Sequence, residues 1–136
     1  LEEYLNKNHI QNSEIFLLRN KSKAGIGFFE DGGFYPDFIL WILKDGKQYI
    51  NFCDPKGIRN LNPKNDPKIN FHKSLKDKEA KLADSSIVLN SFIISNTPFN
   101  KIQDLHSDIT KIEMDTKNVL FQNESGYINT MFSKIL

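Results

Sequence analysis

The chain has 136 residues, of which 39% are hydrophobic and 26% are charged, and its formal net charge at pH 7 is +1. These values are ordinary for a globular domain, and they exclude a polycation that would coat nucleic acid with its whole surface. The longest apolar run, residues 38–43, is far too short to span a bilayer. The single cysteine, Cys53, excludes an internal disulfide and a multi-cysteine zinc site. We therefore expect one intracellular domain over residues 1–136 and no membrane partner.

The first third of the chain predicts a short helix followed by two strands. Residues 1–8 are weakly amphipathic and suit the end of a helix. Residues 14–19 predict a buried strand, and residues 25–29 predict a second, shorter strand before a glycine-rich turn.

A β-hairpin is the strongest local prediction. Asp45-Gly46 lies between two apolar runs, residues 34–43 and 48–53, and this is the best short-range signal for a two-residue hairpin loop. Both faces of the hairpin are apolar, so we expect the sheet to be covered on both sides.

The register of this hairpin places two acids opposite each other. Asp37 lies across from Asp54 in a non-hydrogen-bonded pair, where side chains are closest. At about 5 Å and an effective dielectric constant of about 20, their repulsion is roughly 3 kcal/mol, whereas a favourable cross-strand pair contributes only about 0.2–1 kcal/mol. Two acids in this position need a shared proton or a cation between them. Lys56 follows Asp54 by two residues and therefore lies on the same face.

A helix is predicted after an irregular, proline-containing stretch. Asp66 suits its N-cap and Pro67 its first position. The spacing of Phe71, Leu75 and Leu82 predicts that these side chains form its buried side.

The last third predicts further strands and helices. Residues 86–95 and 119–122 predict strands, and residues 99–105 predict a helical turn or two. Residues 127–136 suit a closing helix, whose apolar face carries Ile128, Met131, Phe132 and Ile135. The order of elements indicates an α/β (α+β) sandwich, in which a central mixed sheet has helices on both faces.

The tetrapeptide Asp54-Pro55-Lys56-Gly57 has two interpretations. Asp, Pro and Gly stand at the positions that a type I turn prefers, so a simple turn accounts for the four residues. A turn does not explain why its aspartate lies opposite Asp37 across the hairpin. That coincidence favours a site in which two hard oxygen ligands and an ammonium group meet, a combination suited to Mg²⁺ and a phosphate.

The arrangement Pro36-Asp37, hairpin, Asp54-Pro55-Lys56 resembles the PD-(D/E)xK nuclease motif of the restriction-endonuclease-like fold. The segments FLLRN, GIGFF, FYPDFILWI and DPKG, in this order, are similar to the C-terminal nuclease domain of type III restriction enzymes, which carry it behind a DEAD/DEAH-type helicase motor. The similarity covers residues 14–56 well and the remainder only in topology. It implies a C-terminal piece of a longer helicase-containing chain, and a first residue other than methionine agrees with this.

The resemblance implies a Mg²⁺-dependent endonuclease that hydrolyses phosphodiester bonds of double-stranded DNA. Asp37, Asp54 and the backbone carbonyl of Pro55 would hold Mg²⁺, with Mn²⁺ as a substitute. Lys56 would position the attacking water or stabilise charge on the scissile phosphate.

The family often adds a glutamate from its first helix. Glu3 is the candidate that we assign to this catalytic role, and Glu2 and Glu14 are alternatives.

A basic stretch indicates a DNA-facing edge. Residues 56–81 hold eight basic side chains against three acids, and Lys56, Arg59, Lys73 and Lys76 are the predicted DNA contacts. A solvated helix face would show the same composition. The resemblance further implies a modification methyltransferase as partner, ATP only for the motor part outside this sequence, and a location in the bacterial cytoplasm.

Two rival readings remain open at this point. One is a DNA-binding or interaction module that keeps the fold without cleaving. The other is an unrelated α+β domain in which residues 54–57 form only a turn.

Overall fold

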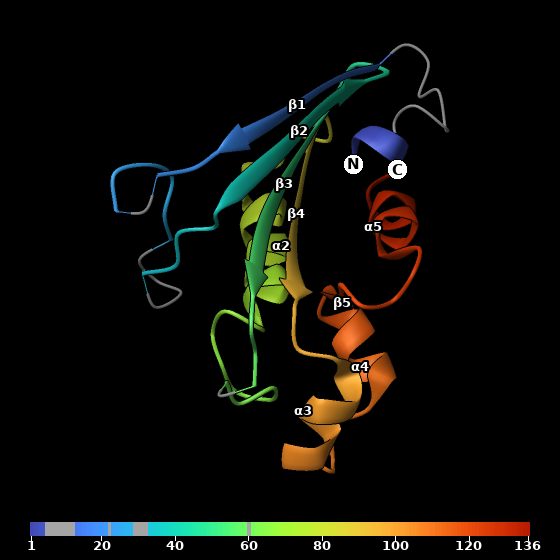
Figure 1. Ribbon diagram of the computed structural model, residues 1–136. Coiled ribbons are helices and arrows are strands. Elements are labelled where there is room, and N and C mark those ends of the chain that lie inside the picture. The colour runs from blue at the N-terminus through green and yellow to red at the C-terminus, as the bar shows by residue number, and fades with distance from the viewer. Residues whose placement is uncertain (5–12, 22, 29–32, 60) are drawn as a thin grey trace.

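A five-stranded mixed sheet forms the centre of the protein in a computed structural model that describes residues 1–4, 13–21, 23–28, 33–59 and 61–136 (Figure 1). The strands follow one another in chain order across the sheet, and β1, β2 and β3 run antiparallel, whereas β3, β4 and β5 run parallel. Their bounds are β1 Ser13–Arg19, β2 Phe38–Lys44, β3 Lys47–Lys56, β4 Ile87–Ser95 and β5 Val119–Phe121. The predicted sandwich with a central mixed sheet is confirmed.

The hairpin of β2 and β3 has the predicted turn and register. Asp45 and Gly46 both adopt positive φ, 51° and 75°, as a type I′ turn requires. The ladder continues from the turn to the pair Phe38 and Cys53. The next opposed positions along both strands are therefore Asp37 and Asp54.

Helices cover both faces of the sheet, as expected from its two apolar faces (Figure 1). On one face, α2 (Phe71–Leu82) packs its buried Phe71 and Leu75 against side chains of β2 and β3. On the other face, α5 (Tyr127–Ile135) packs Met131, Phe132 and Ile135 against the sheet. A third hydrophobic cluster joins α3 (Phe99–Leu105) and α4 (Lys111–Thr116), which lie below β5 in Figure 1, to the segment between β3 and α2. We call it the cluster below β5.

The helix α2 begins later than predicted and buries less of its end. Asp66 is not its N-cap, because residues 67–70 form turns and the helix proper begins only at Phe71, after Asn70. The Asp66 carboxylate accepts the backbone N–H of Lys68 at 2.8 Å and so caps the preceding turn. The predicted burial of Phe71 and Leu75 is confirmed, but Leu82 is 51% exposed at the last turn of the helix.

The strand β1 is an edge strand, so the prediction of a buried strand at residues 14–19 is wrong. Among the described residues it pairs with β2 on one side only, and three of its apolar side chains are about half exposed: Phe16 45%, Leu17 53% and Leu18 44%. An unpaired edge strand leaves backbone groups and side chains in contact with solvent.

Residues 25 and 26 form a bend and residue 27 belongs to no regular element, so the predicted strand is absent there. The cause is Asn20, whose side chain accepts the N–H of Ile26 at 2.9 Å and donates to the Ile26 carbonyl at 2.7 Å, in place of a neighbouring strand. Phe28 forms only an isolated bridge with Phe34, and position 29 lies outside the described residues.

The other predicted elements stand. The structure confirms the strand near residues 86–95, the short helix at residues 99–105, the late strand and the closing helix. Residues 2–4 are helical, and the rest of the predicted first helix lies outside the described residues. The helix α4 was not predicted. In the part of the chain that the structure describes, every helix is too short or too polar to cross a membrane.

Candidate active site

Beyond the last pair of the hairpin ladder, Phe38 and Cys53, each side of the hairpin carries a proline, Pro36 and Pro55. The Lys56 carbonyl accepts the N–H of Asn96 on the β4 side at 3.2 Å, so strand alternation turns the Pro55 carbonyl toward β2. The residue opposite Pro55 is Pro36, which has no N–H to donate. The Pro55 carbonyl therefore receives no ladder hydrogen bond from Pro36.

Residues 54–56 belong to β3 and do not form a turn. Asp54, Pro55 and Lys56 pair with β4 in a parallel ladder that extends to Ser95. The interpretation of this tetrapeptide as a type I turn is wrong, because β4 continues far enough to hold it extended. An extended strand places Asp54 and Lys56 on one face, as predicted.

The Asp54 carboxylate is almost fully buried and has two partners. Asp54 is 4% exposed, its Oδ1 accepts the backbone N–H of Asp37 at 3.1 Å, and its Oδ2 lies 2.6 Å from Lys56 Nζ. The Lys56 ammonium group also lies 5.2 Å from the centre of the Phe34 ring, in cation–π contact. The Lys56 ammonium group thus pairs with one of the two acids, Asp54.

An open hollow of about 330 Å³ surrounds this cluster. We call this space the hollow. It is lined by Gly33, Phe34, Tyr35, Asp37, Asp54, Pro55, Lys56 and Lys68. The structure thus brings together Asp37, Asp54, Pro55 and Lys56, the four residues predicted for metal binding and catalysis.

Tyr35 forms a firm wall of the hollow because its ring lies directly against Gly27. A Cβ atom at Gly27 would stand only 2.3 Å from Tyr35 Cε1. No side chain larger than hydrogen fits at Gly27 without moving the ring.

Lys68 was not predicted as a site residue. The available signal was its place in the basic stretch of residues 56–81, but composition alone does not show which lysine of a stretch reaches the acids.

The remaining predicted residues lie outside the hollow. Glu3 lines a separate hollow with residues 122–129, and Glu14 is exposed on β1. Arg59 and Lys73 are exposed. Of the four predicted DNA contacts, Lys56 lines the hollow, whereas Arg59, Lys73 and Lys76 do not. Lys76 forms an ion pair with Glu79 at 3.0 Å.

The donor set of the hollow fits a hard cation. Two carboxylates and a backbone carbonyl offer the oxygen ligands that Mg²⁺ prefers, and Mg²⁺ commonly keeps several water ligands of its own. Across the described ranges, no group of three or more His, Cys, Asp or Glu side chains is placed to hold a metal. Among the described residues, the hollow therefore offers two carboxylates, Asp37 and Asp54.

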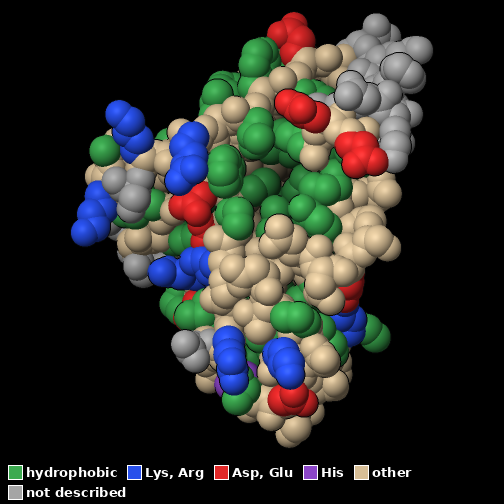
Figure 2. All heavy atoms as spheres, in the orientation of Figure 1, with side chains coloured by type: hydrophobic (Ala, Val, Ile, Leu, Met, Phe, Trp, Pro, Cys, Tyr) green, Lys and Arg blue, Asp and Glu red, His purple; other side chains and the backbone are tan. Residues whose placement is uncertain are grey.

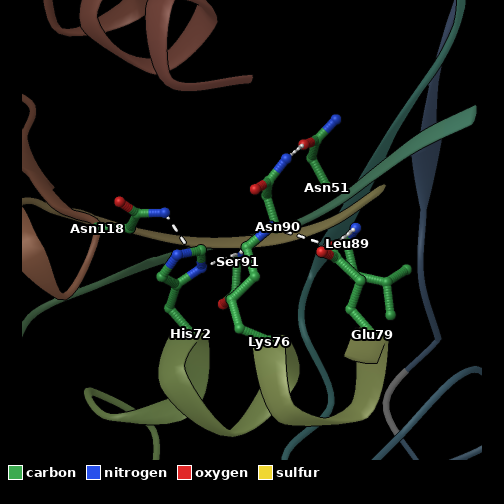
Figure 3. A network of polar contacts seen from close by, with 8 residues as sticks. All are labelled: Asn51, His72, Lys76, Glu79, Leu89, Asn90, Ser91 and Asn118. Carbon is green, nitrogen blue, oxygen red and sulfur yellow. Dashed lines mark hydrogen bonds and ion pairs between the residues drawn. The ribbon is translucent and has the colours of Figure 1, made fainter. Parts of the chain in front are cut away.

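A second polar cluster, which we call the edge network, joins α2 to β4 (Figure 3). Two α2 side chains bind backbone N–H groups of β4: Glu79 Oε2 accepts from Leu89 at 2.6 Å, and His72 Nδ1 accepts from Ser91 at 3.3 Å. Asn118 Nδ2 lies 3.2 Å from the same histidine nitrogen. These contacts cover the part of the β4 edge that β5 leaves unpaired.

We include in the edge network a pair of buried amides, Asn90 on β4 and Asn51 on β3. Asn90 Nδ2 donates to Asn51 Oδ1 at 2.9 Å, and Asn51 Nδ2 donates to the Leu40 carbonyl at 2.8 Å. Figure 3 shows these side chains turned toward one another across the strands.

Two residues with shifted pKa values, His72 and Cys53, have structural roles. Burial, followed by the ammonium groups of Lys76 and Lys134, lowers the pKa of His72 from 6.5 to about 4, so the ring is a neutral acceptor at pH 7. Burial, followed by the charge of Asp54, raises the pKa of the Cys53 thiol to about 12. Cys53 therefore stays a protonated core residue and is no nucleophile.

Hydrophobic side chains gather on the face between β1 and α5 (Figure 2). They include an entirely apolar groove, whose walls come from β1, β2, β3, β4 and α5. The groove offers no polar atom for catalysis, and it lies on the Cys53 and Pro55 side of β3, opposite Asp54.

Comparison with known proteins assigns no family. No family model, curated protein or solved structure matches the chain.

Proposed function

We propose that the protein is a Mg²⁺-dependent endonuclease domain that hydrolyses phosphodiester bonds of double-stranded DNA in the hollow. One observation carries the proposal. The nearly buried Asp54 carboxylate meets the backbone of Asp37 and the ammonium group of Lys56 at the wall of an open hollow. Removing a carboxylate from water is costly, so stability alone does not favour this position for an acid.

Each residue has a chemical role in this proposal. Asp37, Asp54 and the Pro55 carbonyl would hold the metal, which supplies positive charge to phosphate oxygens and lowers the pKa of water. Lys56 stabilises negative charge that develops on the phosphate, and its contact with Phe34 limits where the ammonium group can stand.

The wider setting rests on the resemblance of residues 14–56 to type III restriction enzymes. It comprises a helicase–nuclease polypeptide in the bacterial cytoplasm, a methyltransferase partner, and ATP used by the motor. A restriction-endonuclease-like fold agrees with the mixed sheet covered on both faces.

Thermal unfolding in Mg²⁺ or Mn²⁺ tests the metal site. At ten times the Kd, binding stabilises the folded state by about 1.4 kcal/mol and raises Tm by roughly 3–6 °C. Asp37→Asn should abolish this shift. Asp45→Asn is the matched control, because it removes an acid from the same hairpin at a turn position with positive φ that asparagine tolerates.

Two results would count against the proposal. One is a Tm that does not respond to millimolar metal. The other is an equal loss of the shift in Asp37→Asn and Asp45→Asn. Nicking of supercoiled plasmid in Mn²⁺, lost in Asp37→Asn, would establish hydrolysis. Metal binding together with DNA binding but no nicking would favour the non-cleaving module.

A further inference from the structure

Lys68 brings a second ammonium group to the hollow from a different part of the chain. Lys56 belongs to β3, whereas Lys68 lies at the end of the irregular segment, residues 57–70, that connects β3 to α2. Lys68 takes no part in the Pro-Asp, Asp-Pro-Lys arrangement and is placed in the hollow by the tertiary fold alone.

The segment that carries Lys68 is anchored at several points. Ile58 and Ile69, near its two ends, are buried in the cluster below β5. The N–H of Lys68 itself donates to the Asp66 carboxylate at 2.8 Å. Lys117 Nζ donates to the Pro63 carbonyl at 2.7 Å and so ties the middle of the segment to α4.

These anchors decide how much of Lys68 can move. Its backbone is held by a hydrogen bond and its neighbour Ile69 is buried, so only the side chain has freedom. An ammonium group on a fixed backbone loses less conformational entropy when it binds an anion than one on a mobile loop.

The two lysines of the hollow differ in what they contact. Lys56 is already committed to Asp54 and to the Phe34 ring. Lys68, by contrast, forms no ion pair with any of the residues that the structure describes. A half-buried cation that is unpaired among the described residues and lies beside a carboxylate site is suited to an anionic ligand.

The shape of the hollow indicates which anion. It is open to solvent, its lining is largely polar, and the Tyr35 ring closes one wall against Gly27. A phosphodiester backbone is exposed along a duplex and can enter such an open hollow, and lysine contacts to backbone phosphates orient a protein on DNA.

We propose that Lys68 is a positioning residue that binds a DNA backbone phosphate in the hollow while Asp37, Asp54 and Lys56 face the scissile phosphate. The inference rests on the proposed function and deepens it. Lys68 contributes binding energy and orientation, and it contributes nothing to metal affinity.

Binding of a fluorescein-labelled duplex DNA, followed by anisotropy over a series of salt concentrations, tests this role. The measurements use the Asp37→Asn background, in which the proposed nuclease cannot cleave its probe. Lys68→Gln should weaken binding roughly three- to tenfold and lower the slope of log K against log salt by about 0.9, the value for one phosphate contact. Lys68→Arg should keep most of the affinity.

Lys47→Gln is the matched control, because Lys47 is an exposed lysine at the end of β3 that lies opposite to Lys56 and the hollow. It should leave both the affinity and the salt slope unchanged. If Lys68→Gln behaves like Lys47→Gln, or if the duplex does not bind at all, the inference is overturned.

Failure of the two proposals can be told apart by the metal-dependent Tm shift, measured with Asp37 intact. Lys68→Gln should keep the full shift of the wild-type chain. A lost shift in Lys68→Gln would overturn the positioning role and make Lys68 part of the metal site. No shift in the wild-type chain, with the Lys68 effect on DNA intact, would overturn the nuclease but support Lys68 as a phosphate ligand.

Discussion

The hollow and the edge network are two polar clusters on one sheet, and they differ in how their polar groups are satisfied. In the edge network, His72 and Glu79 accept from backbone N–H groups, and Asn90 and Asn51 donate to an amide and a carbonyl. In the hollow, the Asp54 carboxylate accepts one backbone N–H, from Asp37, but its other oxygen pairs with Lys56 at the border of open solvent. A cluster whose polar groups are satisfied within the protein maintains the fold, whereas a cluster of charged groups at the border of open solvent is suited to a ligand.

The largest expected effect concerns the ion pair of the hollow. Lys56→Met leaves the nearly buried Asp54 carboxylate without its cation, and we expect the free energy of unfolding in metal-free buffer to fall by about 2–4 kcal/mol. Urea denaturation measures the loss. In Mn²⁺ the variant should regain more stability than the wild type does, because no lysine competes for Asp54.

The double variant Lys56→Met, Asp54→Asn is the control for this experiment. It removes the unpaired charge together with its partner, so it should be more stable than Lys56→Met alone. Equal losses in the single and double variants would show that Lys56 stabilises through packing against Phe34 instead.

A smaller effect is expected in the edge network. Asn90→Ala leaves Asn51 Oδ1 buried without its donor, and we expect a loss of about 1–3 kcal/mol that metal does not restore. Asn129→Ala, at an exposed position of α5, should stay within about 0.5 kcal/mol of the wild type. A metal-dependent recovery in Asn90→Ala would remove the distinction between the two clusters.

The smallest effect is a pH dependence caused by His72. Its pKa is about 4 in the folded chain and 6.5 as a reference, so the unfolded chain binds more protons between these values. Stability from this group is complete above about pH 6.5 and is lost as the pH falls toward 4. After allowance for the partial exposure of the ring, we expect about 1 kcal/mol.

The variant His72→Gln isolates this contribution. The difference in unfolding free energy between wild type and variant, measured by urea denaturation from pH 7 to pH 4, should shrink as the pH falls. A constant difference over this range would mean that His72 does not titrate in the folded chain as described.

Local patterns predicted the hairpin and three of the site residues. The Asp-Gly turn sets the register of β2 and β3, and the register brings Asp37 opposite Asp54 with Lys56 on the same face. Each of these steps depends on neighbouring residues and on the period of a strand. Hydrophobic periodicity likewise predicted α3, β4, β5 and α5.

The errors have tertiary or competing local causes. An apolar run does not reveal how many neighbours a strand has, so β1 was predicted as buried although it forms the sheet edge. The start of α2 was misplaced because Asp66 caps a separate turn, residues 67–70, that precedes the helix at Phe71. The helix α4 has few apolar residues, although Thr110 and Glu113 show the spacing of an N-terminal cap.

Lys68 could not be located from the sequence. Its position depends on the path of residues 57–70, which is set by burial of Ile58 and Ile69 against elements far along the chain. The additional acid, for which Glu3 was the candidate, is likewise a question of where separate elements meet.

The tight turn at Asp45-Gly46 also determines the order in which the hollow can assemble during folding. Isolated hairpins form in about 1–10 μs, and this one alone brings Asp37 and Asp54 into register. The parallel pairing of β3 with β4 must wait for closure of the much longer connection through α2. We therefore expect the two acids to meet first, and the lysine of the connecting segment to join them only when the crossover has docked.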